Sequence, residues 1–167
     1  ITEMLSELDE EDDECINIKK DEVKKTNFID VKEIISALNL KTLKGNIVVA
    51  GKTGSGVTTL VNSLLENKKS LVTINQDKNE IDIGYARKRG DLESVKDLNK
   101  DGKSVVFGIY GNYKQQVIGN IKQIEPEFDI SSINYLLLTD FVNGKQHVII
   151  YDINNSKEIH ITKDWKK

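Results

Sequence analysis

The chain has 167 residues, of which 38% are hydrophobic and 31% charged, with eleven glycines and one proline. This composition excludes collagen-like, proline-rich and wholly disordered proteins, and the length suits one domain with its own core. The net charge of −3 is unevenly distributed, because residues 1–14 hold eight of the 27 acidic side chains and no basic one, whereas residues 15–167 hold all 24 basic side chains.

This charge pattern predicts a flexible acidic tail or linker over residues 1–28 and one domain over residues 29–167. The tail is either a solvated flank or a regulatory, partner-binding segment. The single cysteine, Cys15, excludes an internal disulfide and fits the cytoplasm. We expect no transmembrane segment and no signal peptide. Because the first residue is Ile1 rather than methionine, we expect a piece of a longer protein. The modest positive charge of the domain argues against nucleic-acid binding.

Helices and strands alternate over the first part of the domain. Asp30 and Glu33 have capping-box spacing, followed by apolar residues on one helical face as far as Leu38. The apolar run 46–50 predicts a buried strand. After a glycine-rich segment, the apolar spacing from Val57 to Leu65 predicts a second helix.

The remaining patterns complete an α/β domain. We predict strands at 70–74, 80–84 and 104–110, a helix at 91–100 capped by Asp91, and a helix over 117–124 ending before Pro126. The strands at 134–141 and 146–153 flank Asn143-Gly144, which is typical of a hairpin turn, and 158–162 adds a third strand. The expected fold is a three-layer α/β domain with a mainly parallel sheet and an antiparallel C-terminal hairpin.

The segment GKTGSGVT at 51–58 has the spacing of a phosphate-binding loop between a strand and a helix. Glycines let the backbone curl around a phosphate, and the following helix adds the positive end of its dipole. The sequence therefore predicts a P-loop NTPase (RecA-like) domain. The candidate nucleotide-binding residues are Gly51, Lys52, Thr53, Gly54, Ser55, Gly56, Val57, Thr58 and Thr59, with the Thr58 hydroxyl as a magnesium ligand.

The loop lacks the lysine that neutralises the β- and γ-phosphates, because that position is Val57. Losing a charge-assisted hydrogen bond, worth roughly 1.5–3 kcal/mol, should weaken nucleotide binding. Three interpretations are open. Lys52 substitutes for the lysine, within its own chain or toward a neighbouring subunit. Val57 is an engineered knock-out. Or Val57 packs in the core of a loop that no longer holds nucleotide.

The segment NIVVAGKTGSGVTTLVNSLLENKKSLVTI resembles the core of the ATPases that drive type II and type IV secretion, type IV pili and conjugation. The resemblance implies the P-loop fold, ATP and magnesium as ligands, and assembly into oligomers. The resemblance also implies an acidic box, a glutamate and two histidines at catalytic positions, and this chain has other residue types at all of them. Asn75 and Gln76 stand at the acidic box, Tyr85 at the glutamate, and Lys103 and Tyr110 at the two histidines. The family interpretation is then a pseudo-ATPase.

Asp140 ends an apolar run and is a second candidate magnesium ligand, although an aspartate there also suits the start of a turn. Asp82 is a weaker candidate. His147 and His160 lack partners at metal-ligand spacing. The basic run Arg87, Lys88 and Arg89 is either a solvated loop or a contact for an acidic partner or a phosphate.

Tyr110 and Tyr113, beside Gly111-Asn112, form either an interaction surface or partly buried packing, and we favour the packing. From these observations we expect a non-catalytic or regulatory P-loop subunit in the cytoplasm, either free or peripheral at the inner face of the membrane. Its partners would be an active secretion ATPase or a membrane platform component. The alternative is a weak or working ATPase that uses Lys52 and Asp140. A GTP-binding switch lacks its guanine-recognition motif, and a nucleic-acid translocase is the weakest hypothesis.

Overall fold

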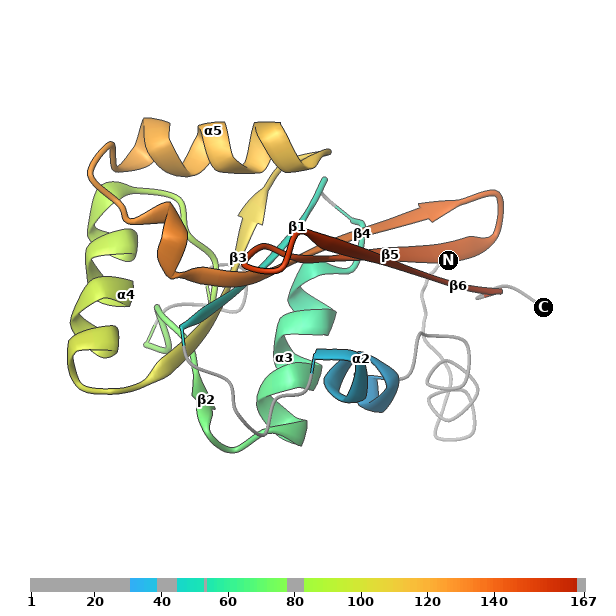
Figure 1. The fold of residues 1–167 in the computed structure, drawn as a ribbon, viewed down its shortest axis with the longest axis horizontal. Coiled ribbons are helices and arrows are strands. Elements are labelled where there is room, and N and C mark those ends of the chain that lie inside the picture. The colour runs from blue at the N-terminus through green and yellow to red at the C-terminus, as the bar shows by residue number, and fades with distance from the viewer. Residues whose placement is uncertain (1–30, 39–44, 53, 78–82, 165–167) are drawn as a thin grey trace.

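The computed structural model describes residues 31–38, 45–52, 54–77 and 83–164. They form an α/β fold around one six-stranded mixed sheet with the strand order β2-β3-β1-β4-β5-β6 (Figure 1). The elements follow in chain order: α2 (Val31–Leu38), β1 (Asn46–Gly51), α3 (Val57–Asn67), β2 (Leu71–Val72), α4 (Arg89–Lys100), β3 (Ser104–Tyr110), α5 (Lys114–Ile124), a 3-10 turn (Ile130–Ser132), β4 (Ile133–Val142), β5 (Lys145–Asp152) and β6 (Lys157–Asp164).

The sheet is parallel in its centre and antiparallel at one side. β1 pairs in parallel with β3 and β4, and β2 pairs in parallel with β3. The chain then returns through two antiparallel pairings, β4 with β5 and β5 with β6. The predicted turn is confirmed, because Asn143 and Gly144 have φ of 52° and 77°, as a two-residue hairpin turn requires. The mostly parallel sheet with a C-terminal hairpin is as predicted.

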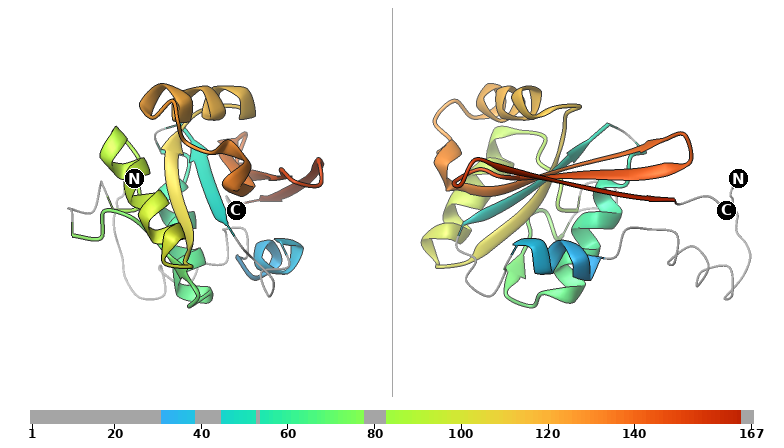
Figure 2. Two further views of the ribbon diagram at one scale, coloured as in Figure 1. Left: turned by 60° about the vertical axis from the view of Figure 1, so that its left-hand side comes forward. Right: turned by 45° about the vertical axis from the view of Figure 1, so that its right-hand side comes forward.

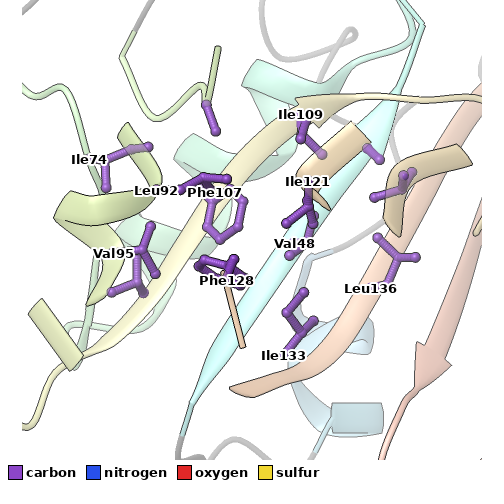
Figure 3. Packing of buried hydrophobic residues seen from close by; sticks show 14 of the residues in the cluster. Val48, Ile74, Leu92, Val95, Phe107, Ile109, Ile121, Phe128, Ile133 and Leu136 are labelled. Carbon is purple, nitrogen blue, oxygen red and sulfur yellow. The ribbon is translucent and has the colours of Figure 1, made fainter. Parts of the chain in front are cut away.

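Helices cover both faces of the sheet, as the two views in Figure 2 make clear. One core lies between the sheet and α2 and α3, where Ile34, Leu38 and the apolar stripe of α3 are buried. The other lies between the sheet and α4 and α5 (Figure 3). There Phe107 meets Phe128 edge to face, with ring centroids 6.4 Å apart. β1 is buried along its whole length because both cores close over it.

Two sequence predictions need correction. The strand expected at 70–74 is reduced to Leu71–Val72. Of the strand expected at 80–84, residues 80–82 lie outside the described residues, and 83–84 form a turn. In the described part of this segment, the pairing continues as one parallel bridge between Tyr85 and Gly108. Positive φ at Asn75 and Gly84 breaks the extended conformation on both sides of this segment.

The helix expected at 91–100 begins earlier, at Arg89. Asp91 is its third residue rather than its cap, yet its carboxylate accepts hydrogen bonds from the backbone N–H groups of Arg87 and Lys88 at 2.8 and 3.1 Å. The carboxylate therefore still closes the helix start, from inside the helix. The acidic tail at 1–28 and the capping residue Asp30 lie outside the described residues.

Candidate functional site

The glycine loop joins the end of β1 to the start of α3, as predicted. The Ser55 N–H donates to the Lys52 carbonyl at 3.0 Å, which makes a tight turn. Gly56 is the N-cap of α3 with φ of 95°, a backbone conformation that glycine adopts without strain. Thr53 lies outside the described residues. The strand, glycine loop and helix therefore have the order that a phosphate-binding loop needs.

The loop folds back onto the ends of β1 and β4. A Cβ on Gly51 would lie 2.1 Å from Ser55 Oγ and 2.7 Å from the Thr139 carbonyl oxygen, so only glycine fits there. Thr139 Oγ1 donates to the Ser55 carbonyl at 3.0 Å. Ser55 Oγ itself is buried and has no hydrogen-bond partner. Leaving a buried hydroxyl without a partner costs about 1–3 kcal/mol.

Val57 is a core residue. Its side chain is 4% exposed and belongs to the core formed by α2, α3 and the sheet. It packs directly on the backbone of β3, because a Cβ on Gly108 would lie 2.8 Å from Val57 Cγ1. The interpretation that Val57 packs with the helix core is confirmed by this burial. Whether the loop holds nucleotide is a separate question.

Tyr85 packs on the same glycine. A Cβ on Gly108 would lie 3.3 Å from Tyr85 Cδ2, and backbone hydrogen bonds join Ala86 N–H to the Gly108 carbonyl at 2.8 Å and Gly108 N–H to the Gly84 carbonyl at 2.6 Å. The Arg87 guanidinium lies 4.6 Å from the Tyr85 ring centroid. Burial raises the pKa of the Tyr85 phenol, with Arg87 acting in the opposite direction, so the ring stays neutral. Val57 and Tyr85, at the positions compared with the lysine and the glutamate, thus meet over Gly108.

Asn75 and Gln76 stand where the secretion ATPases that this chain resembles have acidic residues, and their side-chain amides donate hydrogen bonds. Asn75 Nδ2 donates to the Tyr85 carbonyl at 2.9 Å, and Gln76 Nε2 donates to the Thr73 carbonyl at 3.2 Å. A carboxylate has no proton to donate in either bond. These two amides therefore serve the turn that carries Tyr85.

A cleft of about 430 Å³ lies at the carboxyl ends of β1, β3 and β4. The chain connects from β1 to strands on one side of it and later to β4 on the other side, so the sheet has a topological switch point at β1. The cleft lies at this switch point, which is the usual position of a ligand in such sheets. Its polar lining includes Lys52, Asn112, Asp140 and His147. The structure therefore brings together Lys52 and Asp140, the two residues of the alternative ATPase hypothesis.

Of the two proposed magnesium ligands, Asp140 lines the cleft. Thr58 is exposed on α3 and does not line the cleft. Asp140 Oδ1 accepts the Phe141 N–H at 2.8 Å, as an aspartate before a turn does. Within the described ranges, no group of three or more His, Cys, Asp or Glu side chains has a geometry that would hold a metal ion. Asp82 lies outside the described residues.

The other candidates are on the surface. His160 Nε2 lies 2.5 Å from Glu158 Oε2 on β6. Arg89 pairs with Glu125 at 3.0 Å and Glu93 at 3.5 Å, so this member of the basic run joins α4 to the end of α5. Tyr110 and Tyr113 are 45% and 57% exposed, which favours the surface interpretation over buried packing.

The cleft residue His147 is one that our sequence reasoning considered only as a metal ligand. The structure pairs it with Asp140 across β4 and β5. A two-residue turn at Asn143-Gly144 fixes this register, so the pairing was available from the sequence. The contributions of Gly111 and Asn112 depend on how α5 packs, for which the sequence holds no local signal.

Comparisons with known proteins add no relative. The chain matches no protein-family model, and a search of curated proteins finds no match either. In the part of the chain that the structure describes, no helix is long and apolar enough to cross a bilayer.

Proposed function

We propose that this chain is a non-catalytic or regulatory P-loop subunit, related to the secretion, pilus and conjugation ATPases, that acts through protein–protein assembly. The observation that carries the proposal is that Val57 and Tyr85 both pack on Gly108. Neither residue supplies a charge to a bound phosphate, and both are held by packing. The partners would be an active ATPase of this kind or a component of its membrane platform, in the cytoplasm.

Electrostatics support a scaffold role over catalysis. Phosphoryl transfer depends almost entirely on positioning and charge stabilisation, and the lysine of the loop serves both. Removing one such group typically lowers the rate by about 10²–10³-fold. Here the lysine position is apolar, and the amides of Asn75 and Gln76 donate to backbone carbonyls.

Calorimetric titration of magnesium-ATP tests the proposal, with the unmodified chain and Val57→Lys run in parallel. We expect no saturable heat from the unmodified chain and no magnesium-dependent hydrolysis. Binding by Val57→Lys alone would identify the missing lysine as the disabling change. Magnesium-dependent hydrolysis by the unmodified chain would overturn the proposal.

A second candidate function is a weak ATPase, and one observation favours it. Lys52 and Asp140 line the same cleft at the carboxyl ends of β1 and β4. This hypothesis expects hydrolysis that Lys52→Ala abolishes. Lys69→Ala is the matched control, because Lys69 is an exposed lysine beyond the other end of α3. Equal rates in the two variants would exclude the role of Lys52.

A further inference from the structure

Three large exposed hydrophobic side chains lie at or just after the carboxyl ends of parallel strands. Among the described residues they are Tyr110, Tyr113 and Val142, with exposures of 45%, 57% and 43%. Tyr110 ends β3, Val142 ends β4, and Tyr113 is the N-cap of α5. Because β3 and β4 both run parallel to β1, their carboxyl ends point in the same direction, and β4 extends past the end of β1 into its hairpin with β5 (Figure 1). Val142 lines the cleft and Tyr110 lines a second hollow, and exposed large apolar side chains beside such hollows mark a candidate interaction site.

Two cationic side chains and two surface hollows lie next to these hydrophobic residues. Lys52 is exposed and lines the cleft of about 430 Å³ together with Val142. A second hollow of about 240 Å³, between the end of β3 and α5, is lined by Arg87, Tyr110 and Asn120 among others. We call the set Lys52, Arg87, Tyr110, Tyr113 and Val142 the carboxyl edge. Asp140 is the acidic group of the cleft, and its carboxylate already accepts the Phe141 N–H.

The first residues of the chain have the complementary chemistry. Residues 1–14 carry eight acidic side chains and no basic one. Their apolar residues Ile1, Met4, Leu5 and Leu8 have the i, i+3, i+4, i+7 spacing of an amphipathic helix that docks one face in a groove. Apolar anchors with flanking acids suit an edge of aromatic rings, apolar hollows and cations.

The tether is long enough for this contact within one chain. Fifteen residues, 16–30, separate Cys15 from the start of α2 at Val31. Extended, they span up to about 50 Å. A domain of this size has a radius of gyration of about 14 Å, so the segment can reach either end of the sheet. Tethering also raises the effective concentration of the segment into the millimolar range.

We propose that residues 1–14 dock on the carboxyl edge of their own chain and cover it, with the apolar residues in the two hollows and the acids beside Lys52 and Arg87. A partner that binds this edge must then displace the segment. The inference does not depend on the proposed function, because it concerns a surface and a segment rather than nucleotide chemistry.

Cys15 provides the test, since it is the single cysteine and follows the segment directly. A nitroxide label on Cys15 of the full chain broadens the amide NMR signals of residues near it. We expect broadening at Gly111, Asn112 and Tyr113, and none at Lys103 or Asn155, which precede β3 and β6 at the opposite end of the sheet. The effect should weaken in 1 M salt, where the Debye length falls to about 3 Å from about 10 Å at 0.1 M.

Two variants separate the charge and apolar contributions. Arg87→Glu should reduce the broadening, whereas Lys103→Glu, the same charge change at the opposite end, should leave it intact. Replacing Leu5 and Leu8 by serine alters the segment without touching the described fold and should also reduce it. Unchanged spectra elsewhere verify folding in each case.

Several outcomes would overturn the inference. They are no broadening, broadening spread evenly over both ends of the sheet, or equal effects of Arg87→Glu and Lys103→Glu. Mixing ¹⁵N-labelled, untagged protein with unlabelled, tagged protein tests for exchange between chains. Broadening at the carboxyl edge of the untagged chain would show docking on a second copy and contradict the proposal of docking within one chain.

Discussion

Replacing Val57 with lysine restores the residue type that a phosphate-binding loop needs, and we expect the variant to be less stable. The Val57 side chain is 4% exposed, and it contacts Gly108 on β3. Full burial of a valine side chain contributes about 1.5–3 kcal/mol. A lysine there must either bury its ammonium beside Tyr85 or extend its stem to the surface, and the stem recovers part of the apolar contact.

The net loss of stability should be about 1–3 kcal/mol, the usual range for forcing a longer side chain into a packed core. For a domain of this size each kcal/mol lowers Tm by about 2–4 °C, so the expected fall is about 2–12 °C. Thermal unfolding followed by circular dichroism measures it, with unfolding treated as two-state.

Thr58→Lys is the matched control for this variant. Thr58 is exposed and also lies in the first turn of α3, so both lysines experience the same unfavourable helix dipole. A surface substitution of this kind should change stability by no more than about 0.5 kcal/mol. If Val57→Lys lowers Tm no further than Thr58→Lys, Val57 is not held by the packing described above, and the reasoning about the loop fails.

Three further predictions concern packing, a buried amide and a carboxylate. Gly108→Ala should lower the free energy of unfolding in urea by about 1–3 kcal/mol, because its Cβ would lie 2.8 Å from Val57 Cγ1. Gly119→Ala is the control, because the space around Gly119 is open, and it should stabilise α5 by up to about 1 kcal/mol. A change of the same sign in the free energy of unfolding of both variants would contradict the packing of Val57 on Gly108. Asn99→Ala should destabilise by about 1–3 kcal/mol, because Asn46 and Asn99 exchange side-chain hydrogen bonds of 3.0 and 2.9 Å and the wholly buried Asn46 amide would lose a partner; an unchanged urea midpoint would refute this. The Glu127 N–H and Arg89 hold the pKa of Glu125 below its ordinary value of 4.5. This carboxylate therefore contributes stability that is present above pH 4.5 and is lost as the pH falls through its lower pKa in the folded protein. Glu125→Gln should lose less stability on acidification, measured by urea unfolding, and a loss equal to that of the unmodified chain would exclude the contribution.

Local patterns predicted most of the fold. The β1 run, the glycine loop and α3 follow one another in sequence, and each carries its own signal in apolar periodicity or glycine spacing. The hairpin from β4 to β5 was predictable for the same reason, because Asn143-Gly144 fixes both the turn and the register.

The predictions failed where tertiary contacts override local preference. Residues 70–74 have the composition of a strand, yet only Leu71 and Val72 pair with β3. Asn75, with φ of 56°, turns the chain away, and its amide is satisfied by the Tyr85 carbonyl. The start of α4 was misplaced because Asp91 closes the helix from its third position. In the cleft, Lys52 and Asp140 come together only because β1 and β4 are neighbours, which is a property of the strand order.

Because Val57 and Tyr85 both pack on Gly108, the substitutions at these two positions are not independent of each other. Val57 and Tyr85 are 28 residues apart in the sequence, so as separate substitutions they look like two independent losses. In the structure both side chains pack on one glycine of β3, which a larger residue could not replace. Residues that share a contact have coupled effects on stability, so a change at one alters the tolerance at the other. If Val57 alone were replaced by lysine, the new ammonium would lie near the neutral Tyr85 ring instead of near a glutamate. If Tyr85 alone were replaced by glutamate, the new carboxylate would lie near the apolar side chain of Val57. Changing either position alone to the residue type of the compared family therefore introduces a mismatched neighbour, so we expect the two positions to have coupled effects on stability.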